Sequence, residues 1–392
     1  MGSRSRIALR VAAILGVLLL ASAVASPFGP SAPISGRQTE CVSRPAAPPP
    51  TPYAAVVARA RAIACARLAD HIPGLAVAVA VDGRIVWSEA FGYADLDAKT
   101  PATPATQFRI GSVSKPLTAA AVAQLYEQGK LDLDAPVQRY VPSFPDKGHP
   151  VTTRLVAGHL AGIRHYRGDE FLSNRRFTSV VAGLAIFKDD SLLFAPGTHF
   201  SYSTYGWTLI SAAVEGASGD EFLAYMRKRV FGPLGMRSTA PDKNDSLIPE
   251  RTHFYERERG SGGGYRVAPT VDNSYKWAGG GFLSTAEDLV RFGSAFLQSG
   301  FLKAETLELL FTPQHTNGGQ PTTYGIGWYV DRDSLGHRVV YHGGGSVGGT
   351  TAFIADRDSR VVLAVVTNLS DANLDAAAEI RRLFDTAVNR QP

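Results

Sequence analysis

Strand-like segments lie near both ends of this 392-residue chain, and helix-like segments lie between them. Residues 74–81 and 84–91 are rich in β-branched and small apolar residues, and the Asp82-Gly83 dipeptide between them is typical of a tight hairpin turn. Four further strand-like segments follow late in the chain, at 324–331, 338–342, 349–355 and 361–368. One sheet assembled from the two chain ends and flanked by helices satisfies this order. The pattern predicts an α/β (α+β) fold in which a mostly helical region, roughly 119–298, is inserted between the two halves of the sheet.

Apolar residues recur at helical spacing at both ends of the chain and inside the inserted region. The segment 286–298 directly follows Ser284-Thr285, which is a helix N-cap signal. We expect helices at 53–70, 115–128, 286–298 and 372–388.

Ser112 and Lys115 are three residues apart at the start of the helix expected at 115–128. Residues with this spacing share one helix face, so the lysine amine would lie against the serine hydroxyl. A serine hydroxyl is a weak nucleophile unless a base takes its proton, and a lysine that is desolvated or held near other cations can act as that base. The helix N-terminus would also direct backbone N–H groups at an oxyanion. By itself the pair is a weak signal, and a helix cap with a solvated lysine explains it better.

Two further elements accompany the serine–lysine pair in order along the chain. Tyr202-Ser203-Thr204 lies in a turn before the apolar segment 207–214, and His342-Gly343-Gly344-Gly345 follows the strand-like segment 338–341. Ser-x-x-Lys, Tyr-x-polar and His-x-Gly in this order resemble the penicillin-recognising serine hydrolases, which include class C β-lactamases, D-alanyl-D-alanine peptidases and β-lactamase-like esterases. The similarity extends over roughly 53–388 and is greatest to the mitochondrial serine β-lactamase-like branch of animals. It is carried also by the segments 108–115, 126–134, 158–166 and 271–285.

The resemblance implies a β-lactamase/transpeptidase-like fold with an antiparallel sheet, and it implies a role for each motif residue. Ser112 is expected to attack a carbonyl and form an acyl-enzyme, while Lys115 and Tyr202 pass its proton. The backbone N–H groups of Ser112 and Gly345 are expected to form the oxyanion hole. We expect no cofactor and no metal, since the histidines and cysteines form no His-x-x-x-His or Cys-x-x-Cys pattern. The residues expected to contact the substrate are His342, Gly344 and Thr204.

Two positions depart from the pattern of β-lactamases. His342 stands where those enzymes carry a lysine, and a neutral histidine attracts a substrate carboxylate less strongly. Thr204 stands where many relatives carry asparagine, and it hydrogen-bonds a substrate amide less completely. Both changes favour peptide or ester substrates over penicillins, so we expect a serine peptidase or esterase. A β-lactamase or a D-alanyl-D-alanine carboxypeptidase is the alternative enzyme. A scaffolding protein that forms homo-oligomers or filaments and keeps a vestigial activity is the alternative of another class.

The net charge of +5 does not indicate a nucleic-acid-binding protein. The first 52 residues hold five arginines and one glutamate, a net charge of +4, which leaves +1 for the rest of the chain. A nucleic-acid-binding protein concentrates basic residues on its folded body. No nucleic-acid partner is therefore expected.

The first 25 residues are typical of an export signal. Three arginines precede the apolar segment 11–21, and Ala23-Val24-Ala25 is a small-x-small cleavage site. We therefore expect a periplasmic or secreted protein. An uncleaved N-terminal membrane anchor is the second interpretation. A mitochondrial transit peptide is the third, since no acidic residue precedes Glu40.

Residues 26–52 contain eight prolines and are expected to form an extended linker ahead of a catalytic domain at 53–392. The two cysteines, Cys41 and Cys65, suit an oxidising compartment. One disulfide would join the linker to the first helix; otherwise the pair stays reduced.

Two weaker signals accompany the motifs. The segment 275–281 forms either a wall of the active site or a structural turn with Trp277 in the core. His159 is expected to be a buried, hydrogen-bonded residue rather than a catalytic one.

Overall fold

The computed structural model describes residues 41–69, 72–258, 263–298 and 300–388. The expected signal segment at 1–25 and the first part of the expected linker, 26–40, lie outside these residues. No helix of the described ranges is both long and apolar enough to cross a membrane.

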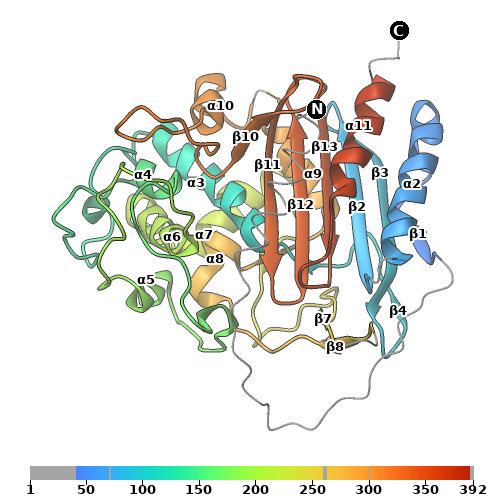
Figure 1. The fold of residues 1–392 in the computed structure, drawn as a ribbon, viewed down its shortest axis with the longest axis horizontal. Coiled ribbons are helices and arrows are strands. Elements are labelled where there is room, and N and C mark those ends of the chain that lie inside the picture. Colours follow the sequence, from blue (N-terminus) through green and yellow to red (C-terminus); the bar gives the residue numbers. More distant parts are fainter. Residues whose placement is uncertain (1–40, 70–71, 259–262, 299, 389–392) are drawn as a thin grey trace.

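The main sheet is antiparallel and has strands from both ends of the chain, as predicted (Figure 1). Strand β2 pairs with the late strand β13 from Val81↔Val361 to Leu75↔Thr367, and this pairing joins the two halves. The strand order is β1-β3-β2-β13-β12-β11-β10, with β4 attached to β3. The strands are β1 (Ser43–Pro45), β2 (Gly74–Val81), β3 (Arg84–Asp95), β4 (Thr100–Pro101), β10 (Tyr329–Arg332), β11 (Arg338–Ser346), β12 (Gly349–Asp356) and β13 (Val361–Thr367).

Both faces of the sheet are buried, and alternate residues of β2 belong to two different cores. Ala76, Ala78 and Ala80 pack into the core shared with the inserted helical region. Leu75 and Val77 pack into the core on the opposite face. Alternation with period two therefore places small side chains on one face and β-branched or larger ones on the other. Helices α2 (Ala54–Ala69) and α11 (Ala376–Val388) cover the second face, and α9 (Ala286–Ala295) covers the first.

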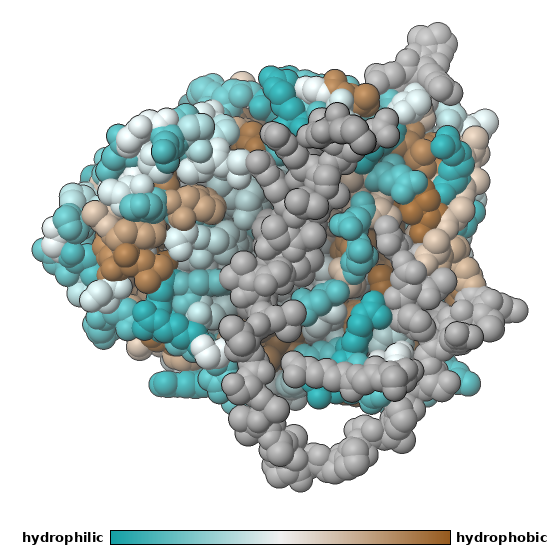
Figure 2. Space-filling model, in the orientation of Figure 1, coloured by the Kyte–Doolittle hydropathy of each residue, from teal (hydrophilic) through white to brown (hydrophobic). Residues whose placement is uncertain are grey.

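The inserted region forms a mostly helical body beside the sheet, on the left in Figure 1. Helix α3 is apolar on all sides and nearly all of it is buried, which is the property of a helix at the centre of a domain. Figure 2 shows a hydrophobic cluster on the outer surface of this body, and Leu193 and Phe200 are among the exposed large apolar residues of the chain. The helices are α3 (Ser114–Glu127), α4 (Thr153–Ala157), α5 (Val180–Gly183), α6 (Thr204–Ser218), α7 (Phe222–Tyr225), α8 (Trp277–Gly280) and α10 (Ala304–Phe311). Short strands β5 (Phe108–Arg109), β9 (Phe282–Ser284) and β6 (Ala240–Pro241) form a second sheet, and β7 (Tyr255–Arg257) pairs with β8 (Tyr265–Val267).

Two local predictions are corrected. The segment 324–331 is a strand only from Tyr329, because the chain before it turns tightly against α10: a Cβ at Gly325 would lie 2.1 Å from the Leu310 carbonyl oxygen. The described end of the expected linker is part of the sheet, since Ser43–Pro45 pairs with the edge of β3. Cys41 and Cys65 form a disulfide that fastens this end to α2.

Candidate active site

The Ser112 hydroxyl lies at the junction between the helical body and strand β11. Ser112 is in a 3-10 turn (Gly111–Val113) directly before α3, and its Oγ is 2.9 Å from Lys115 Nζ. One helical turn therefore brings the two side chains together, as their spacing predicts. Gly111 has φ +50°, and a Cβ there would lie 2.5 Å from the Gly345 carbonyl oxygen. Glycine at this position lets the serine turn lie directly against the strand.

The Lys115 amine is enclosed by polar atoms that carry no negative charge. It lies 2.9 Å from Ser112 Oγ and donates hydrogen bonds to the Gly279 carbonyl oxygen at 2.7 Å and to Thr204 Oγ1 at 3.2 Å. The side chain is fully buried. Burial, and next the positive charge of Lys276, hold the pKa of Lys115 well below its ordinary value. A neutral amine at this place can accept the Ser112 proton.

The Tyr202 phenol completes the polar centre. Its ring centroid lies 4.8 Å from Lys115 Nζ, and its hydroxyl is buried without a hydrogen-bond partner among the described residues. Burial raises the pKa of Tyr202 well above its ordinary value, and the nearby Ser112 hydroxyl, which acts in the opposite direction, does not outweigh it. Tyr202 therefore stays a neutral phenol, which suits it to relay a proton rather than to act as a permanent phenolate base.

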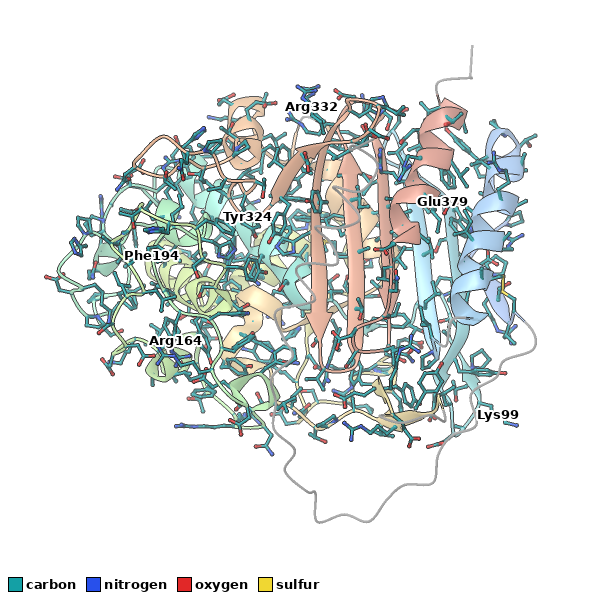
Figure 3. The ribbon with its side chains drawn as sticks, viewed as in Figure 1. Lys99, Arg164, Phe194, Tyr324, Arg332 and Glu379 are labelled. Carbon is teal, nitrogen blue, oxygen red and sulfur yellow. A yellow bond between two sulfur atoms is a disulfide. The ribbon has the colours of Figure 1, made fainter. Side chains whose placement is uncertain are left out.

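Histidine and tyrosine rings hold the Tyr202 ring in place. The His159 ring packs against it at 4.3 Å between centroids, and His159 Nδ1 accepts a hydrogen bond from the Ser203 backbone N–H. Burial, and then the Lys115 charge, lower the pKa of His159 well below its usual range. His159 is thus a buried, neutral and hydrogen-bonded residue, as predicted. Tyr324, which Figure 3 labels between the helical body and the sheet, contacts both rings.

His342, which the sequence places among the substrate contacts, lies beside the polar centre, with its ring centroid 6.3 Å from that of Tyr202. Its ring is buried, with Nε2 2.9 Å from the Tyr324 hydroxyl and Nδ1 2.6 Å from the Gly343 carbonyl oxygen. Burial, and next the Lys115 charge, lower the pKa of His342 to about 3. The ring is therefore neutral and both of its nitrogens already have partners. His342 therefore holds the Tyr324 hydroxyl in place.

The glycines after His342 bring the strand backbone to the nucleophile. Strand β10 pairs with β11 only as far as Tyr341, so the edge of β11 beyond this point lies against the serine turn. A Cβ at Gly344 would lie 2.0 Å from the Ile110 carbonyl oxygen, and one at Gly111 would lie 2.8 Å from the Gly345 backbone nitrogen. The serine turn and strand β11 therefore approach so closely that no side chain fits between their backbones at these glycines. This close approach brings the Gly345 amide to the Ser112 turn, where the sequence expects the oxyanion hole.

Comparison with known proteins agrees with this architecture. The sequence model of the Beta-lactamase family matches residues 57–388. The human (Homo sapiens) mitochondrial serine β-lactamase-like protein LACTB is 33% identical over an alignment 423 positions long, gaps included, which covers 80% of this chain and 76% of that protein. The chain belongs to the β-lactamase family. As a member of it, the protein is a serine hydrolase, and the predicted resemblance is confirmed.

Solved structures of β-lactamase-family proteins share the fold. An octameric penicillin-binding protein homologue from Pyrococcus abyssi is similar with a TM-score of 0.70 and 25% identity, over 85% of this chain and 77% of that one. A D-stereospecific amidohydrolase from Streptomyces sp. is similar with a TM-score of 0.66 and 25% identity, over 80% of this chain and 95% of that one. The predicted mixed fold with an antiparallel sheet is confirmed.

Three residues of this β-lactamase-family site have no motif signal of their own. Gly279 contributes its carbonyl to Lys115, and a Cβ there would lie 2.6 Å from Thr204 Cγ2. Tyr324 lies in a segment that the sequence predicts as a strand, and nothing in that pattern indicates its hydrogen bond to His342. Lys276 lies on the expected wall at 275–281, where it is 2% exposed, and Trp277 next to it is buried as well. The wall therefore lines the polar centre and also contributes to the core.

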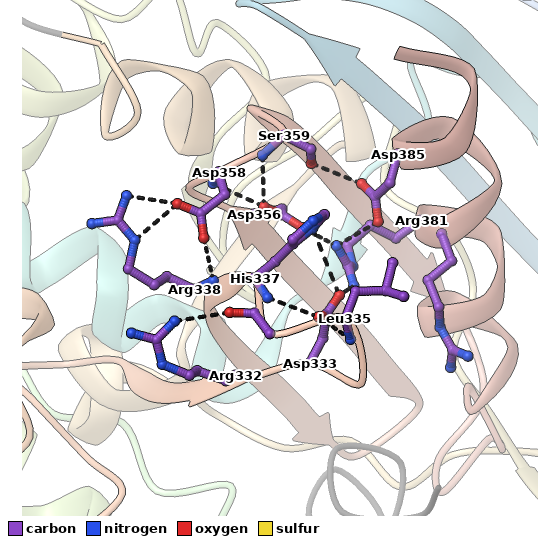
Figure 4. Close-up of polar contacts among 12 residues, drawn as sticks. Arg332, Asp333, Leu335, His337, Arg338, Asp356, Asp358, Ser359, Arg381 and Asp385 are labelled. Carbon is purple, nitrogen blue, oxygen red and sulfur yellow. Dashed lines mark hydrogen bonds and ion pairs between the residues drawn. The ribbon is translucent and has the colours of Figure 1, made fainter. Parts of the chain in front are cut away.

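A group of acidic residues and a histidine elsewhere in the described chain has the composition of a metal site. It lies between the β10–β11 turn and α11 (Figure 4) and comprises Asp333, His337, Asp356 and Asp385. The Arg381 guanidinium lies among these carboxylates: it donates to Asp333 at 2.6 Å, to Asp385 at 2.7 Å and to Asp356. An arginine of the chain itself thus binds all three carboxylates, and the cluster is a buried ion network.

Proposed function

We propose that this chain hydrolyses peptide or ester carbonyls through an acyl-enzyme on Ser112. The observation that carries the proposal is the position of a buried Lys115 amine, which has no carboxylate partner among the described residues, 2.9 Å from the Ser112 hydroxyl. A surface lysine at this spacing would be protonated and could not act as a base. Lys115 differs from a surface lysine because it is enclosed against Gly279 and Thr204, away from solvent.

Acylation uses the three side chains in sequence. Ser112 Oγ forms a bond to the carbonyl carbon while its proton moves to Lys115 Nζ, and the backbone N–H groups of Ser112 and Gly345 stabilise the oxyanion. Each such donor contributes about 3–4 kcal/mol of transition-state stabilisation in well-studied enzymes. When the tetrahedral intermediate collapses, the bond to the leaving group breaks, and the Tyr202 hydroxyl donates a proton to that group. Lys115 returns its proton to Tyr202.

Deacylation reverses the same path. A water molecule takes the place of the leaving group, and Tyr202 and Lys115 together accept its proton as it attacks the ester carbonyl. The bond between the carbonyl carbon and Ser112 Oγ then breaks, and the serine recovers a proton from Lys115. No step needs a metal or a cofactor, because the lysine acts as the base and the backbone amides act as the electrophile.

The expected substrates are peptides or esters rather than penicillins. His342 is neutral, buried and bonded to Tyr324, so the position where β-lactamases carry a lysine offers no cation. Thr204 Oγ1 is already an acceptor for Lys115. The similarity to a D-stereospecific amidohydrolase from Streptomyces sp. supports an amide or peptide substrate. The alternative activity, that of a β-lactamase or a D-alanyl-D-alanine carboxypeptidase, would be recognised by turnover of nitrocefin or of a D-alanyl-D-alanine peptide.

The experiment compares the wild type with Ser112→Ala and Lys115→Arg on a short-chain p-nitrophenyl ester and on a D-alanyl p-nitroanilide. Both variants should lose at least about 10²-fold in kcat, because the nucleophile or the base is removed while the fold is kept. A fluorophosphonate probe should label the wild type and not Ser112→Ala. Equal turnover by wild type and Ser112→Ala would refute the proposal. Wild-type kcat in Lys115→Arg would refute the role of Lys115 as the base.

The scaffolding alternative predicts large assemblies with little Ser112-dependent turnover. The octameric relative from Pyrococcus abyssi supports an oligomeric form of this chain, which light scattering of the purified protein would measure.

We also propose export to the periplasm or the extracellular space, with a membrane tether if the N-terminal segment is kept. The Cys41–Cys65 disulfide supports an oxidising compartment. Fractionation of cells that express the full chain tests the location.

A further inference from the structure

Lys276 is a buried cation without a counter-ion, on the wall of the active site. The residue is 2% exposed. Among the described residues its amine has no hydrogen bond or ion pair, and Asp242 is the one carboxylate that acts on it. Its contacts are aromatic: Nζ lies 4.4 Å from the Phe171 ring centroid, 5.2 Å from that of Tyr275 and 5.6 Å from that of Tyr166. We call these three rings with Lys276 the aromatic cage. Cation–π contacts recover only part of the cost of removing an ammonium group from water.

The carboxylates around the aromatic cage already form ion pairs with arginines. Asp242, the carboxylate that acts on Lys276, binds Arg109 Nε at 2.7 Å and also contacts Arg251. Glu170 on the other side binds Arg164. Arg109 and Arg251 share the single carboxylate of Asp242. The surroundings of Lys276 therefore carry an excess of positive charge even when Lys115 is neutral.

The aromatic cage is held rigidly by hydrogen bonds outside it. The Tyr275 hydroxyl donates to the Glu170 backbone carbonyl at 3.0 Å, and the Tyr205 hydroxyl donates to the Glu170 carboxylate at 2.8 Å. Arg164, labelled in Figure 3, binds the same carboxylate at 2.7 Å. The segment that carries Tyr166 and Phe171 is therefore fixed before any ligand binds, which is how a binding site of defined shape is built.

The Lys276 side chain lies one residue's width from the nucleophile. A methyl group placed on Gly280 would be 3.8 Å from Lys276 Cδ and 3.7 Å from the Gly111 carbonyl carbon. Gly111 immediately precedes Ser112, so Gly280 is close both to the lysine side chain and to the serine turn. Tyr202, which donates to the leaving group, comes from the segment that precedes α6 instead. A group that reaches Lys276 past Gly280 therefore belongs to the part of the substrate that stays on the serine.

We propose that Lys276 binds a carboxylate on the acyl part of the substrate, so that the enzyme prefers acyl groups with an anionic end. This inference rests on the proposed function, since it names the substrate class of the same site. A carboxylate in the aromatic cage would accept the hydrogen bonds that the buried amine otherwise lacks, and it would neutralise the excess charge.

The test compares two p-nitrophenyl esters of equal acyl length, the monoadipate with a terminal carboxylate and the neutral hexanoate. We expect the wild type to favour the monoadipate by at least about tenfold in kcat/KM, the typical effect of one charge-assisted hydrogen bond. Lys276→Met keeps an unbranched chain among the rings and should abolish the preference, while Lys276→Arg should keep part of it. The matched control is Lys130→Met, which removes an exposed lysine and should leave the ratio unchanged.

The ratio of the two rates is the informative quantity, because removal of Lys276 also raises the pKa of Lys115 and so lowers both rates at neutral pH. Burial, and next the Arg109 charge, lower the pKa of Lys276 to about 7. The preference of the wild type should therefore decline as the pH rises above about 7, where the free amine loses its charge while the carboxylate keeps its own.

An equal ratio in wild type and Lys276→Met would overturn the inference and leave the proposed function intact. A preference for anionic substrates that appears only when the carboxylate is on the leaving group would also overturn the inference. If neither ester is turned over faster by the wild type than by Ser112→Ala, the proposed function fails. The role of Lys276 is then tested by ligand binding instead of turnover. Calorimetry with adipamate and hexanamide on Ser112→Ala should show binding of the anion alone, and loss of it when Lys276→Met is added. Equal binding of the two amides would overturn the inference in that case.

Discussion

The buried ion network of Figure 4 supports a quantitative prediction about stability. We expect Arg381→Gln to destabilise the fold strongly. Arg381 is 2% exposed and belongs to α11, whereas Asp333 follows β10 and Asp356 ends β12. The guanidinium thus fastens the last helix to the far edge of the sheet. Its removal leaves three carboxylates in a buried space, where the His337 ring is 3.0 Å from Asp356 and 3.9 Å from Asp333.

The magnitude follows from the cost of an uncompensated buried charge. Removal of one partner from a buried ion pair costs about 3–5 kcal/mol. For a chain of 392 residues, the entropy of unfolding is about 0.8 kcal/mol per kelvin, so the melting temperature should fall by about 4–6 °C. The control is the neighbouring Arg382, which is exposed and whose Nε donates a hydrogen bond to the Ala378 carbonyl of its own helix. Arg382→Gln should change the melting temperature by less than about 1 °C.

The assay is thermal unfolding followed by circular dichroism at pH 7.5 and at pH 5. Without the guanidinium, mutual repulsion raises the pKa values of the carboxylates in the folded state above their unfolded values near 3.9. A raised folded pKa means that the folded state binds protons first as the pH falls, so the variant recovers stability toward acid. Burial already raises the pKa of Asp385 to about 6 in the presence of Arg381, which acts against it. The gap between variant and wild type should therefore narrow at pH 5. A gap below 1 °C at pH 7.5, or one that widens at pH 5, would contradict this reasoning.

Three further outcomes are expected. Tyr202→Phe should lower kcat for ester turnover about 10²-fold or more with KM nearly unchanged, because only a proton relay is removed; an unchanged kcat would exclude the relay. Gly111→Ala should lower kcat/KM by at least about 10²-fold, since its Cβ would lie 2.5 Å from a carbonyl oxygen of β11 and displace the oxyanion hole. Gly129→Ala has the same backbone strain in open space and should keep activity, which separates displacement from strain. Reduction of the Cys41–Cys65 disulfide, measured by calorimetry with and without reductant, should cost about 3 kcal/mol of unfolding free energy for a loop of this length; an equal melting temperature would show that the loop is held otherwise.

Local patterns of the sequence determine much of what this protein is. The spacing of Ser112 and Lys115 on a helix places their side chains together, because a helical turn has a fixed pitch. The Asp82-Gly83 turn and the alternation in 74–81 specify the β2–β3 hairpin and its two buried faces. These features depend on neighbours within one turn or one hairpin, and so they can be derived from the chain alone.

Long-range packing decided the properties that make the site chemically competent. The pairing of β2 with β13 joins segments almost 300 residues apart, and no local signal specifies their register. The lowered pKa of Lys115 comes from its burial against Gly279 and Thr204, and sequence spacing carries no information about solvent exposure. The same holds for Lys276, whose amine lacks a counter-ion only because Asp242 is bound elsewhere. Charge, burial and distance are properties of the assembled fold, and they determine which of the motif residues can react.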